Sequence, residues 1–305
     1  MKAGIVGLPN VGKSTLFNCL SNAKAQSANF PFCTIEPNIG VVNVPDPRIN
    51  KLEELVKPER VQMATVDIVD IAGLVKGASK GEGLGNQFLG NIRECNAIIH
   101  VLRCFDNDNI VHVDGNVNPI RDKETIDIEL QLKDLDTVEK RLEKVNRAAK
   151  TGNKEAITEK ALLDRIKDTL LQAKSARTIT LESNDEEVLM EGFQLITAKP
   201  VLYVCNVDEN SAVNGNKYVD QVKELVKDED AEVIILSVGA EADITELESY
   251  EERQVFLEDM GLTEPGASVL IRAAYKLLKQ QTYFTAGVKE AVSYTHLTLP
   301  TIYSV

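Results

Sequence analysis

The sequence is poor in the residues that build disulfide and metal sites. Its five cysteines are odd in number and scattered, and no pair has zinc-ligand or C-x-x-C spacing, so we expect reduced thiols. Three histidines are too few for a histidine-rich metal site. No apolar run approaches the roughly 20 residues that a membrane helix needs, which excludes a spanning segment. The apolar start is interrupted at Pro9 and Lys13, unlike a signal peptide, so we expect a cytoplasmic protein.

Basic residues are also in short supply. The chain has 34 Lys and Arg against 47 Asp and Glu, a net charge of −13 over 305 residues. Broad binding to nucleic acid needs many basic contacts to phosphate, so we expect no such activity and no sequence-specific DNA partner, although a local basic patch stays compatible. The length suggests about two domains. A composition of 43% apolar and 27% charged residues excludes a wholly disordered chain.

Six short apolar runs punctuate the chain, with helical patterns between them. They are Lys2–Val6, Ile39–Val44, Ala64–Asp70, Ala97–Leu102, Val201–Cys205 and Glu232–Leu236. Several are continuously apolar rather than alternating, which is typical of strands buried on both faces of a mostly parallel sheet. The sequence therefore predicts an α/β fold.

The stretch from Glu124 to Arg177 breaks this rhythm with two helical patterns around a turn signal at Thr151–Asn153. The expected apolar positions are Ile128, Leu132, Leu135, Leu142 and Val145, then Ile157, Leu162, Ile166, Leu170 and Ala173. We predict an antiparallel coiled-coil hairpin inserted into the α/β domain. The expected division is 1–122 with 199–276 for the discontinuous nucleotide-binding domain and 123–198 for the insertion.

The charge of the hairpin is opposite to that of the chain. Lys140 to Arg177 holds 11 basic and 5 acidic residues, a net +6. One interpretation is an ordinary solvated helix surface. The other is a projecting arm that docks on a polyanion such as ribosomal RNA. No aromatic residues interleave the charges, which argues against base stacking there.

A phosphate-binding motif follows the first apolar run. Gly7-Leu-Pro-Asn-Val-Gly-Lys-Ser14 matches G-x-x-x-x-G-K-[ST] between a predicted strand and a predicted helix, the context that the motif requires. Backbone N–H groups and the helix N-terminus favour phosphate there. Lys13 can reach the β- and γ-phosphates, and the Ser14 hydroxyl can bind Mg²⁺.

Two further segments have the pattern of nucleotide switches. Asp70-Ile-Ala-Gly73 is D-x-x-G at the end of a predicted buried strand, where Asp70 can hold Mg²⁺ through water and the Gly73 N–H can sense the γ-phosphate. Thr34 lies between the motifs and can close on Mg²⁺ in the triphosphate state. Such loops are ordered by the γ-phosphate and released after hydrolysis. The predicted metal ligands are therefore Ser14, Thr34 and Asp70.

The predicted base site departs from the guanine-selective pattern N-K-x-D. Asn206-Val207-Asp208-Glu209 follows a predicted strand, with Glu209 where the guanine-binding Asp would stand. A longer carboxylate does not keep the same bidentate geometry, so guanine selectivity should be weak and ATP should be admitted. The lost contact is worth roughly 1–3 kcal/mol by analogy with base readout. The segment Ser237-Val238-Gly239 is placed to contact the base through its backbone.

The residues for hydrolysis are unusual. Ras-like proteins place a water-positioning glutamine after D-x-x-G, whereas this chain has Leu74. Two candidates take its place. Asn10 can coordinate a monovalent cation such as K⁺ beside the phosphates, and His112 can swing in from a polar loop when a partner docks. The plainer interpretation of His112 is an ordinary loop histidine.

Together the phosphate loop, the segment Asp70–Gly85 and the N-x-x-E at Asn206–Glu209 resemble the Obg-related YchF proteins, the Obg-like ATPases. The resemblance runs to about Glu290. It implies a Ras-like G domain that favours ATP over GTP, a helical hairpin, a C-terminal TGS domain and association with the ribosome in translation or stress responses. By motif, phosphate and Mg²⁺ would be bound by Asn10, Val11, Gly12, Lys13, Ser14 and Thr15. Asn206, Val207 and Glu209 would lie at the base.

The C-terminus departs from that family. Residues 277–290 resemble the start of a TGS domain, and 291–305 resemble a non-native tail, so we expect the strand Thr282–Val288 to lack its sheet and expose an edge. We expect a monomer. The leading function is a slow Mg²⁺-dependent nucleoside triphosphatase that binds the ribosome. The alternatives are a nucleotide-gated binding module with negligible turnover, a GTP-specific Obg-type GTPase, and a P-loop kinase, for which neither an acceptor site nor a lid is evident.

Overall fold

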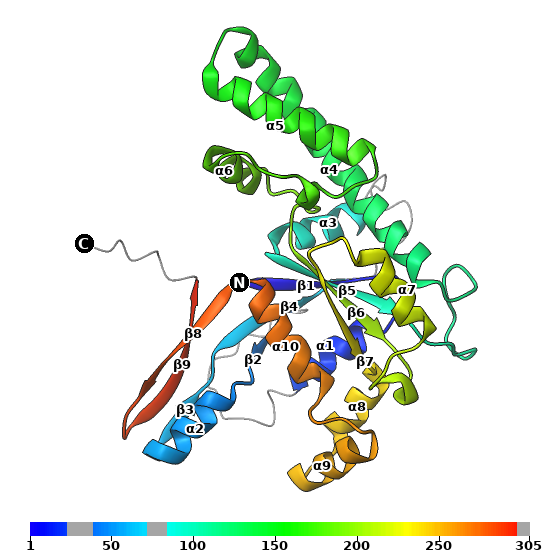
Figure 1. Ribbon diagram of the computed structural model, residues 1–305, viewed down its shortest axis with the longest axis vertical. Helices are drawn as coiled ribbons and strands as arrows, with labels where there is room; N and C mark the ends of the chain where they lie inside the picture. The colour runs from blue at the N-terminus through cyan, green and yellow to red at the C-terminus, as the bar shows by residue number, and fades with distance from the viewer. Residues whose placement is uncertain (23–38, 72–83, 298–305) are drawn as a thin grey trace.

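The computed structural model describes residues 1–22, 39–71 and 84–297. A six-stranded sheet with helices on both faces forms the body, and two long helices project from it as an arm (Figure 1). Within the described ranges no helix is both long and apolar enough to cross a membrane.

The large sheet has the strand order β2-β4-β1-β5-β6-β7. All neighbouring strands are parallel except β2, which pairs antiparallel with β4. The predicted α/β class and mostly parallel sheet are therefore confirmed. The strands are β1 (Lys2–Val6), β2 (Ile39–Asn43), β4 (Thr65–Asp70), β5 (Ala97–Arg103), β6 (Val201–Asn206) and β7 (Glu232–Leu236).

The continuous apolar runs mark the centre of this sheet. Every residue of β5 and β6 is buried, as expected of parallel strands covered on both faces. Helices α1 (Lys13–Asn22) and α10 (Gly266–Leu277) cover one face. The other face is covered by α3 (Leu84–Glu94), α7 (Lys217–Val226) and the first turns of α4 (Figure 1). The remaining helices of the body are α2 (Pro47–Val56), α8 (Val238–Glu246), α9 (Tyr250–Asp259) and the short η3 (Glu209–Ser211).

The arm consists of α4 (Pro119–Lys150) and α5 (Lys154–Leu171), joined at the predicted turn. Asn118 and Asn153 cap the two helices by accepting backbone N–H bonds, which explains where each begins. At 1.5 Å per residue, the 32 residues of α4 span about 48 Å. The predicted hairpin is confirmed, and α4 begins four residues before the boundary expected at 123.

The inner face of the arm differs from the predicted one. Ile128, Leu132 and Ile157 are 49%, 40% and 49% exposed. Ile126 and Leu130 point inward instead and join the core of the body. The reason is that the first half of α4 packs on the sheet rather than on α5, so its buried stripe is set by a different neighbour. Predicted inner positions that are buried are Leu142, Leu162, Ile166 and Leu170.

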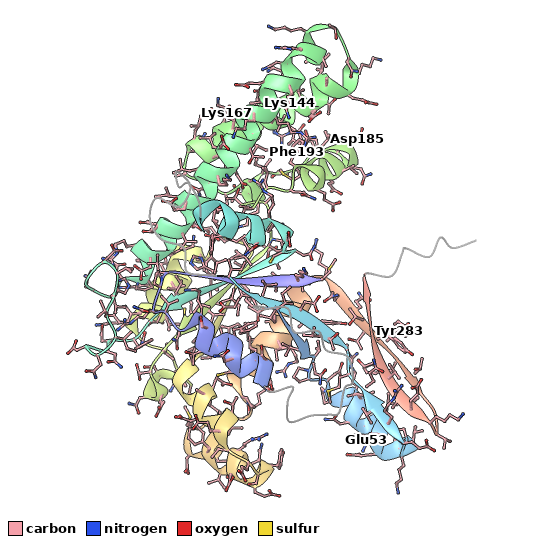
Figure 2. The ribbon with its side chains drawn as sticks, turned by 180° about the vertical axis from the view of Figure 1, so that it is seen from behind. Glu53, Lys144, Lys167, Asp185, Phe193 and Tyr283 are labelled. Carbon is pink, nitrogen blue, oxygen red and sulfur yellow. The ribbon has the colours of Figure 1, made fainter. Side chains whose placement is uncertain are left out.

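The arm has a small core of its own and a rigid attachment. Val138 and Leu163 lie in a cluster with the side chain of Phe193, from α6 (Asn184–Phe193) beside η2 (Ala176–Thr178). Figure 2 shows Phe193 facing the arm. At the base, the fully buried Asp134 carboxylate accepts hydrogen bonds from the N–H groups of Ile196 and Thr197, at 3.0 and 2.7 Å.

A second sheet corrects the expectation for the C-terminus. It has the order β3-β9-β8, with β3 (Arg60–Gln62), β8 (Gln280–Ala286) and β9 (Glu290–Leu297). The strand expected to lack a sheet pairs antiparallel with β9, and β9 pairs parallel with β3. The expected lack of a sheet was wrong because β9 supplies the missing neighbour, and Ala291 and Val292 are buried. The strand does lie at an edge of that sheet, as expected. Residues 298–305 lie outside the described residues, and the predicted domain boundaries stay predictions.

Candidate nucleotide-binding site

The phosphate loop connects β1 directly to α1. Its backbone takes positive φ at Gly7 (154°), Asn10 (63°) and Gly12 (100°), so that the chain reverses within a few residues. A Cβ on Gly12 would lie 2.6 Å from the Asn206 Nδ2, and one on Gly7 would lie 2.5 Å from the Val101 carbonyl oxygen. Both the conformation and the close neighbours therefore require glycine.

Lys13 is folded back across this loop. Its Nζ donates to the Leu8 carbonyl oxygen at 2.6 Å, and the side chain is buried. Burial lowers the pKa of Lys13 to about 8, and the nearby Asp70 carboxylate opposes that shift. A buried ammonium with one carbonyl partner gains most from an anion placed beside it, so the site favours phosphate.

Ser14 and Asp70 form a donor set that suits Mg²⁺. The two side chains hydrogen-bond to each other, and burial raises the pKa of the Asp70 carboxyl while Ser14 and Lys13 oppose the rise. The Asp70 Oδ1 is buried and has no hydrogen-bond partner among the described residues. An orphaned carboxylate oxygen beside a hydroxyl is the kind of oxygen ligand that a hard divalent cation needs. Thr15 is exposed in the same helical turn as Ser14, whereas Thr34 and Gly73 lie outside the described residues.

Asn206 joins two loops. Its Nδ2 donates to the Val11 carbonyl oxygen at 2.9 Å, and its Oδ1 accepts from the Val238 N–H at 3.0 Å. We expected Asn206 to lie at the base, but both polar ends of its buried side chain are taken up by backbone groups. Its contribution is to hold the phosphate loop against the start of α8.

The remaining predicted base residues lie at the ends of β6 and β7. The Val207 side chain is 2% exposed and packs within the main core, so a contact of this residue with the base stays a prediction. Asp208 caps η3 by accepting from Ser211, which leaves Glu209 exposed, and within the described residues the Glu209 carboxylate has no partner. Ser237 caps α8 through its Oγ, and the exposed Gly239 lies in the first turn of that helix.

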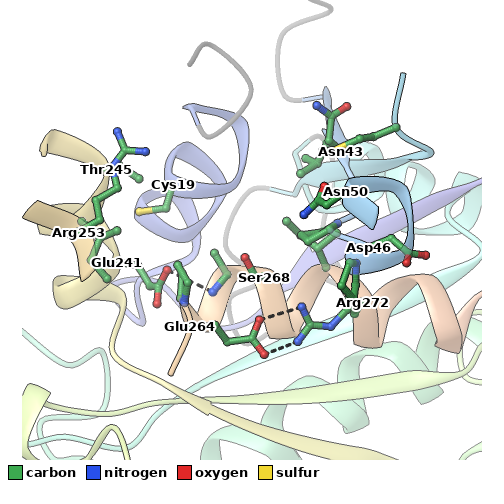
Figure 3. Close-up of a pocket in the computed structure, with 18 residues that line it drawn as sticks. Cys19, Asn43, Asp46, Asn50, Glu241, Thr245, Arg253, Glu264, Ser268 and Arg272 are labelled. Carbon is green, nitrogen blue, oxygen red and sulfur yellow. Dashed lines mark hydrogen bonds and ion pairs between the residues drawn. The ribbon is translucent and has the colours of Figure 1, made fainter. Parts of the chain in front are cut away.

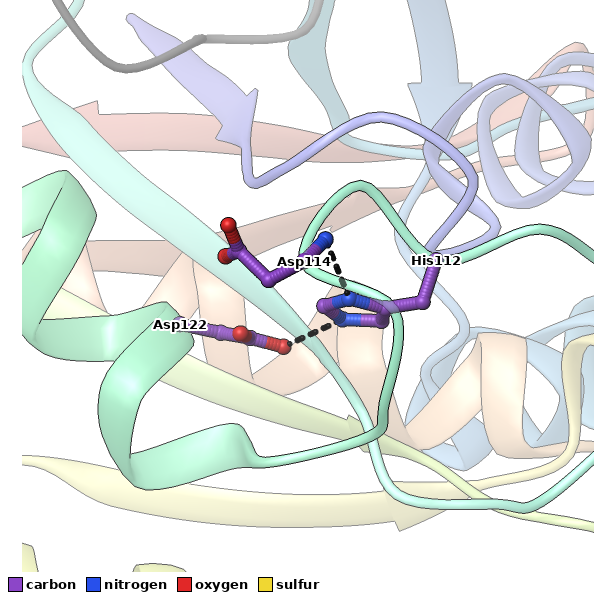
Figure 4. A group of neighbouring side chains, drawn as sticks. All are labelled: His112, Asp114 and Asp122. Atoms are coloured by element: carbon purple, nitrogen blue, oxygen red, sulfur yellow. Dashed lines mark hydrogen bonds and ion pairs between the residues drawn. The ribbon is translucent and has the colours of Figure 1, made fainter.

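His112 is buried, contrary to the expectation of a free loop residue. Its Nε2 lies 2.8 Å from the Asp122 Oδ2, and its Nδ1 accepts from the Asp114 N–H at 3.1 Å (Figure 4). The adjoining residue contacts the phosphate loop, because the Asn10 Nδ2 donates to the Val111 carbonyl oxygen at 3.1 Å. The structure thus brings the loop of His112 to Asn10 but turns the ring itself away into the protein.

Two residues that organise this loop were missed in the sequence. The buried Arg103 donates to the carbonyl oxygens of Phe105, Asn107 and Ile110 at 3.2, 3.0 and 2.9 Å. Asp122 lies in the first turn of α4, and its second oxygen accepts from Arg121 at 3.2 Å. Arg103 could have been found in the sequence, because it is a charged residue at the end of an otherwise apolar strand. Asp122 could not, because an acidic residue in the first turn of a helix is common.

Two other groupings carry no site of their own. Side chains of His112, Asp114 and Asp122 converge within 4.8 Å, but the Arg121 guanidinium lies beside both carboxylates and already balances their charge. A cavity of about 890 Å³ lies between α1, α8 and α10 and the segment from the end of β2 into α2 (Figure 3). Its acids are satisfied: Glu241 accepts from the Gly266 and Ala267 N–H groups, and Glu264 pairs with Arg272.

Comparison with known proteins agrees with this geometry. The family model of the 50S ribosome-binding GTPase matches residues 2–134. The ribosome-binding ATPase YchF of Escherichia coli O157:H7 is 54% identical over 96% of this chain and 80% of its own length. The protein of the same name from Bacillus subtilis is 50% identical over 97% of this chain and 81% of its own length.

A solved structure gives the same result for the fold. The YchF GTPase of Schizosaccharomyces pombe superposes with a TM-score of 0.85 at 36% sequence identity, covering 97% of this chain and 80% of that one. Identity at this level over nearly the whole chain, together with the shared arrangement of sheet and arm, means that this chain belongs to the YchF family.

Proposed function

We propose that this chain is an Mg²⁺-dependent nucleoside triphosphatase that prefers ATP and binds the ribosome through the tip of its arm. The observation that carries the proposal is the convergence of Lys13, Ser14 and the orphaned Asp70 oxygen at a glycine turn. The relatives from E. coli and B. subtilis are named ribosome-binding ATPases, which supports both parts of the proposal.

Each group at the turn has a defined task with a bound triphosphate. Lys13 leaves the Leu8 carbonyl oxygen and pairs with the β- and γ-phosphates, which compensates its buried charge. Ser14 and Asp70 would hold Mg²⁺, and Thr34 and Gly73 are proposed to complete the switch from segments outside the described residues. The bound Mg²⁺ would neutralise negative charge on the phosphate oxygens.

Base selection follows from the end of β6. Because Asp208 is engaged in capping η3, the free carboxylate is that of Glu209, on a longer side chain than guanine-selective sites use. Without the bidentate contact, guanine loses its advantage, and ATP binds as well or better. Backbone groups of Ser237, Val238 and Gly239 lie beside the same edge, where Asn206 holds them.

Hydrolysis requires a water aimed at the γ-phosphorus, so that the bond to the β–γ bridging oxygen breaks and ADP and phosphate are released. We assign the positioning of that water to His112, which lies one residue from the carbonyl that Asn10 contacts. The Asn10 Oδ1 remains available to a monovalent cation such as K⁺. Because His112 is turned inward, turnover by the isolated protein should be slow.

The arm supplies a polyanion-binding surface. Most of its basic residues are neutralised by acids, such as Arg141 by Glu159 and Lys167 by Glu139. Toward the turn the pattern changes. Four basic residues there form no ion pair within the described ranges: Lys144, Arg147, Lys150 and Lys154. Unpaired positive charge on an otherwise acidic protein favours a phosphate-rich partner, and ribosomal RNA fits it.

A nucleotide assay tests the proposal. Competition between ATP and GTP should favour ATP in the wild type, and Glu209→Asp should shift the preference toward GTP by about fivefold or more. Lys13→Ala should lower turnover by about hundredfold or more. Ribosomes and K⁺ should raise the wild-type rate. ATP binding without turnover in any condition would support the nucleotide-gated binding module instead, and absence of Mg²⁺-dependent ATP binding would refute the proposal.

A further inference from the structure

The ring of His112 offers no nitrogen to a substrate water in this arrangement. Its Nδ1 accepts from the Asp114 N–H, so a neutral ring carries its proton on Nε2 and donates it to Asp122. The side chain is 4% exposed. A residue that positions water must present a nitrogen within hydrogen-bond distance of that water, and here both are occupied inside the protein.

The partner that occupies Nε2 is itself fixed. Asp122 is 1% exposed, with one oxygen on His112 and the other on Arg121. The next residue, Lys123, pairs with Asp127 at 2.7 Å and with Glu229 at 2.8 Å, which anchors the first turn of α4 to the body. The carboxylate that restrains the histidine therefore belongs to the helix that extends to the tip of the arm.

The segment around His112 has an unusual distribution of buried and exposed side chains. Arg103 fixes the loop as far as Ile110, but Val111 and Val113 are 74% and 50% exposed while the histidine between them is buried. Aliphatic side chains are usually buried and imidazoles are more often exposed, so this segment shows the reverse of the usual distribution. Turning the histidine outward would bring valine inward, and the hydrophobic gain would offset part of the lost hydrogen bond.

We propose that Asp122 is a positioning residue that holds His112 in an unreactive, parked orientation, and that release of His112 is coupled to the first turn of α4 (Figure 4). The inference rests on the proposed triphosphatase function and deepens it. A partner that docks on the arm or on the exposed valines would shift the balance toward the released orientation, in which Nε2 faces the phosphates.

The opposite assignment, in which Asp122 activates His112 as in a catalytic dyad, conflicts with the geometry. In a dyad the carboxylate holds one ring nitrogen and the other faces the reacting atoms. Here the other nitrogen accepts from the Asp114 N–H. The two assignments predict opposite signs: removing the carboxylate lowers turnover if it activates the ring and raises turnover if it restrains it.

The test measures basal ATP turnover of the full chain carrying Asp122→Ala, Asp122→Asn or Asp122→Glu. Removing the acceptor should raise kcat by about tenfold while KM for ATP stays within about twofold, because only the population of the competent orientation changes. The increase in kcat should be smaller for Asp122→Asn, because the amide keeps a weaker hydrogen-bond acceptor. Asp122→Glu should keep a kcat near that of the wild type. Ribosomes should stimulate the wild type strongly and Asp122→Ala little.

Two further variants distinguish a specific restraint of His112 by Asp122 from a general destabilisation of α4. Asp134→Asn disturbs a buried carboxylate of the same helix that does not touch His112, and it should leave basal kcat unchanged. The double variant Asp122→Ala with His112→Gln should lose the gain. A gain that survives in the double variant, a fall in kcat with Asp122→Ala, or an equal gain with Asp134→Asn would each overturn the proposal.

A spectroscopic readout keeps the proposal testable apart from turnover. Nitrogen-15 labelling of the three histidines should show one ring in the Nε2-protonated form with slow exchange in the wild type, and Asp122→Ala should abolish that signal. An unchanged signal would refute the parking. If the wild type bound ATP but never hydrolysed it, the proposed enzyme function would fail, while this spectrum would still decide whether Asp122 holds the ring.

Discussion

At the scale of single residues, burial sets the charge of His100. It lies in the centre of β5 with its ring 5.6 Å from that of Tyr203, and in the part of the chain that the structure describes its Nε2 has no hydrogen-bond partner. Burial lowers the pKa of His100 to about 3, and the charges of Lys123 and Arg177 add to the effect. The ring is therefore neutral in the folded protein at every pH near neutrality.

This neutrality predicts how stability depends on pH. The unfolded chain gains a proton on His100 below about pH 6.5, whereas the folded protein resists protonation down to a pKa of about 3. The contribution is fully present above pH 6.5 and is lost as the pH falls toward 3, by about 1.4 kcal/mol per pH unit. Urea unfolding at pH 7.5 and 5.5 should show His100→Leu losing about 1.4 kcal/mol less than the wild type over this interval.

The comparison of these two proteins isolates His100, because the other titrating groups are common to both. An equal loss in the free energy of unfolding for wild type and variant would mean that His100 is protonated in the folded protein. The variant also removes a buried nitrogen without a partner, so its stability at pH 7.5 should lie close to that of the wild type.

Residues with a motif were predictable, and those that act through tertiary contacts were not. Gly12 and Lys13 have fixed spacing because a phosphate turn has fixed backbone geometry, and both lie where expected. The link that Asn206 makes between two loops was not predictable, since its partners Val11 and Val238 are distant in sequence. The pairing of His112 with Asp122 spans a loop whose path no local pattern determines.

At the scale of elements, the attachment of the arm depends on Asp134. Its carboxylate accepts three hydrogen bonds, from the N–H groups of Ile196 and Thr197 and from the Thr197 hydroxyl at 2.7 Å. An amide at this position has a single acceptor oxygen, so Asp134→Asn leaves at least one N–H facing a donor. We expect a loss of about 1–3 kcal/mol in the free energy of unfolding.

Chemical unfolding and hydrogen exchange check this expectation. The N–H groups of Ile196 and Thr197 should exchange faster in Asp134→Asn, while those of β5 and β6 change little. Asp136→Asn is the matched control, because that side chain lies two residues on, is half exposed and forms an exposed ion pair with Lys140. If both variants lost the same stability, the buried carboxylate would not be what attaches the arm.

Elements were predictable where one neighbour decides the pattern. The strands β5 and β6 are apolar throughout because both faces are covered, and the turn of the arm is marked by Gly152. The inner face of α4 was mispredicted because its first half packs on the sheet and its second half on α5, so one period does not describe both. Strand β9 was missed because its pairing with β3 is set by residues some 230 positions away.

At the scale of the whole molecule, charge is separated along the arm. The chain carries a net −13, yet toward the turn of the arm Lys144, Arg147, Lys150 and Lys154 take part in no ion pair of the described residues. Figure 2 labels Lys144 on the arm. Acidic charge on the body repels a phosphate backbone, so a polyanion is oriented toward the far end of α4. Under the proposed function, this separation of charge would favour docking of a polyanion in one orientation, at the tip of the arm.

Reversing the charge of the tip should therefore weaken ribosome binding and reduce its dependence on salt. For Lys144→Glu with Arg147→Glu and Lys150→Glu, we expect the slope of log affinity against log salt to become shallower by about 2–3, since each lost phosphate contact removes roughly one. Co-sedimentation across a salt series measures it, with nucleotide binding unchanged. The matched control reverses Lys217, Lys223 and Lys227, which are exposed on the body at α7. Equal weakening by both triple variants would assign the effect to net charge and not to the arm.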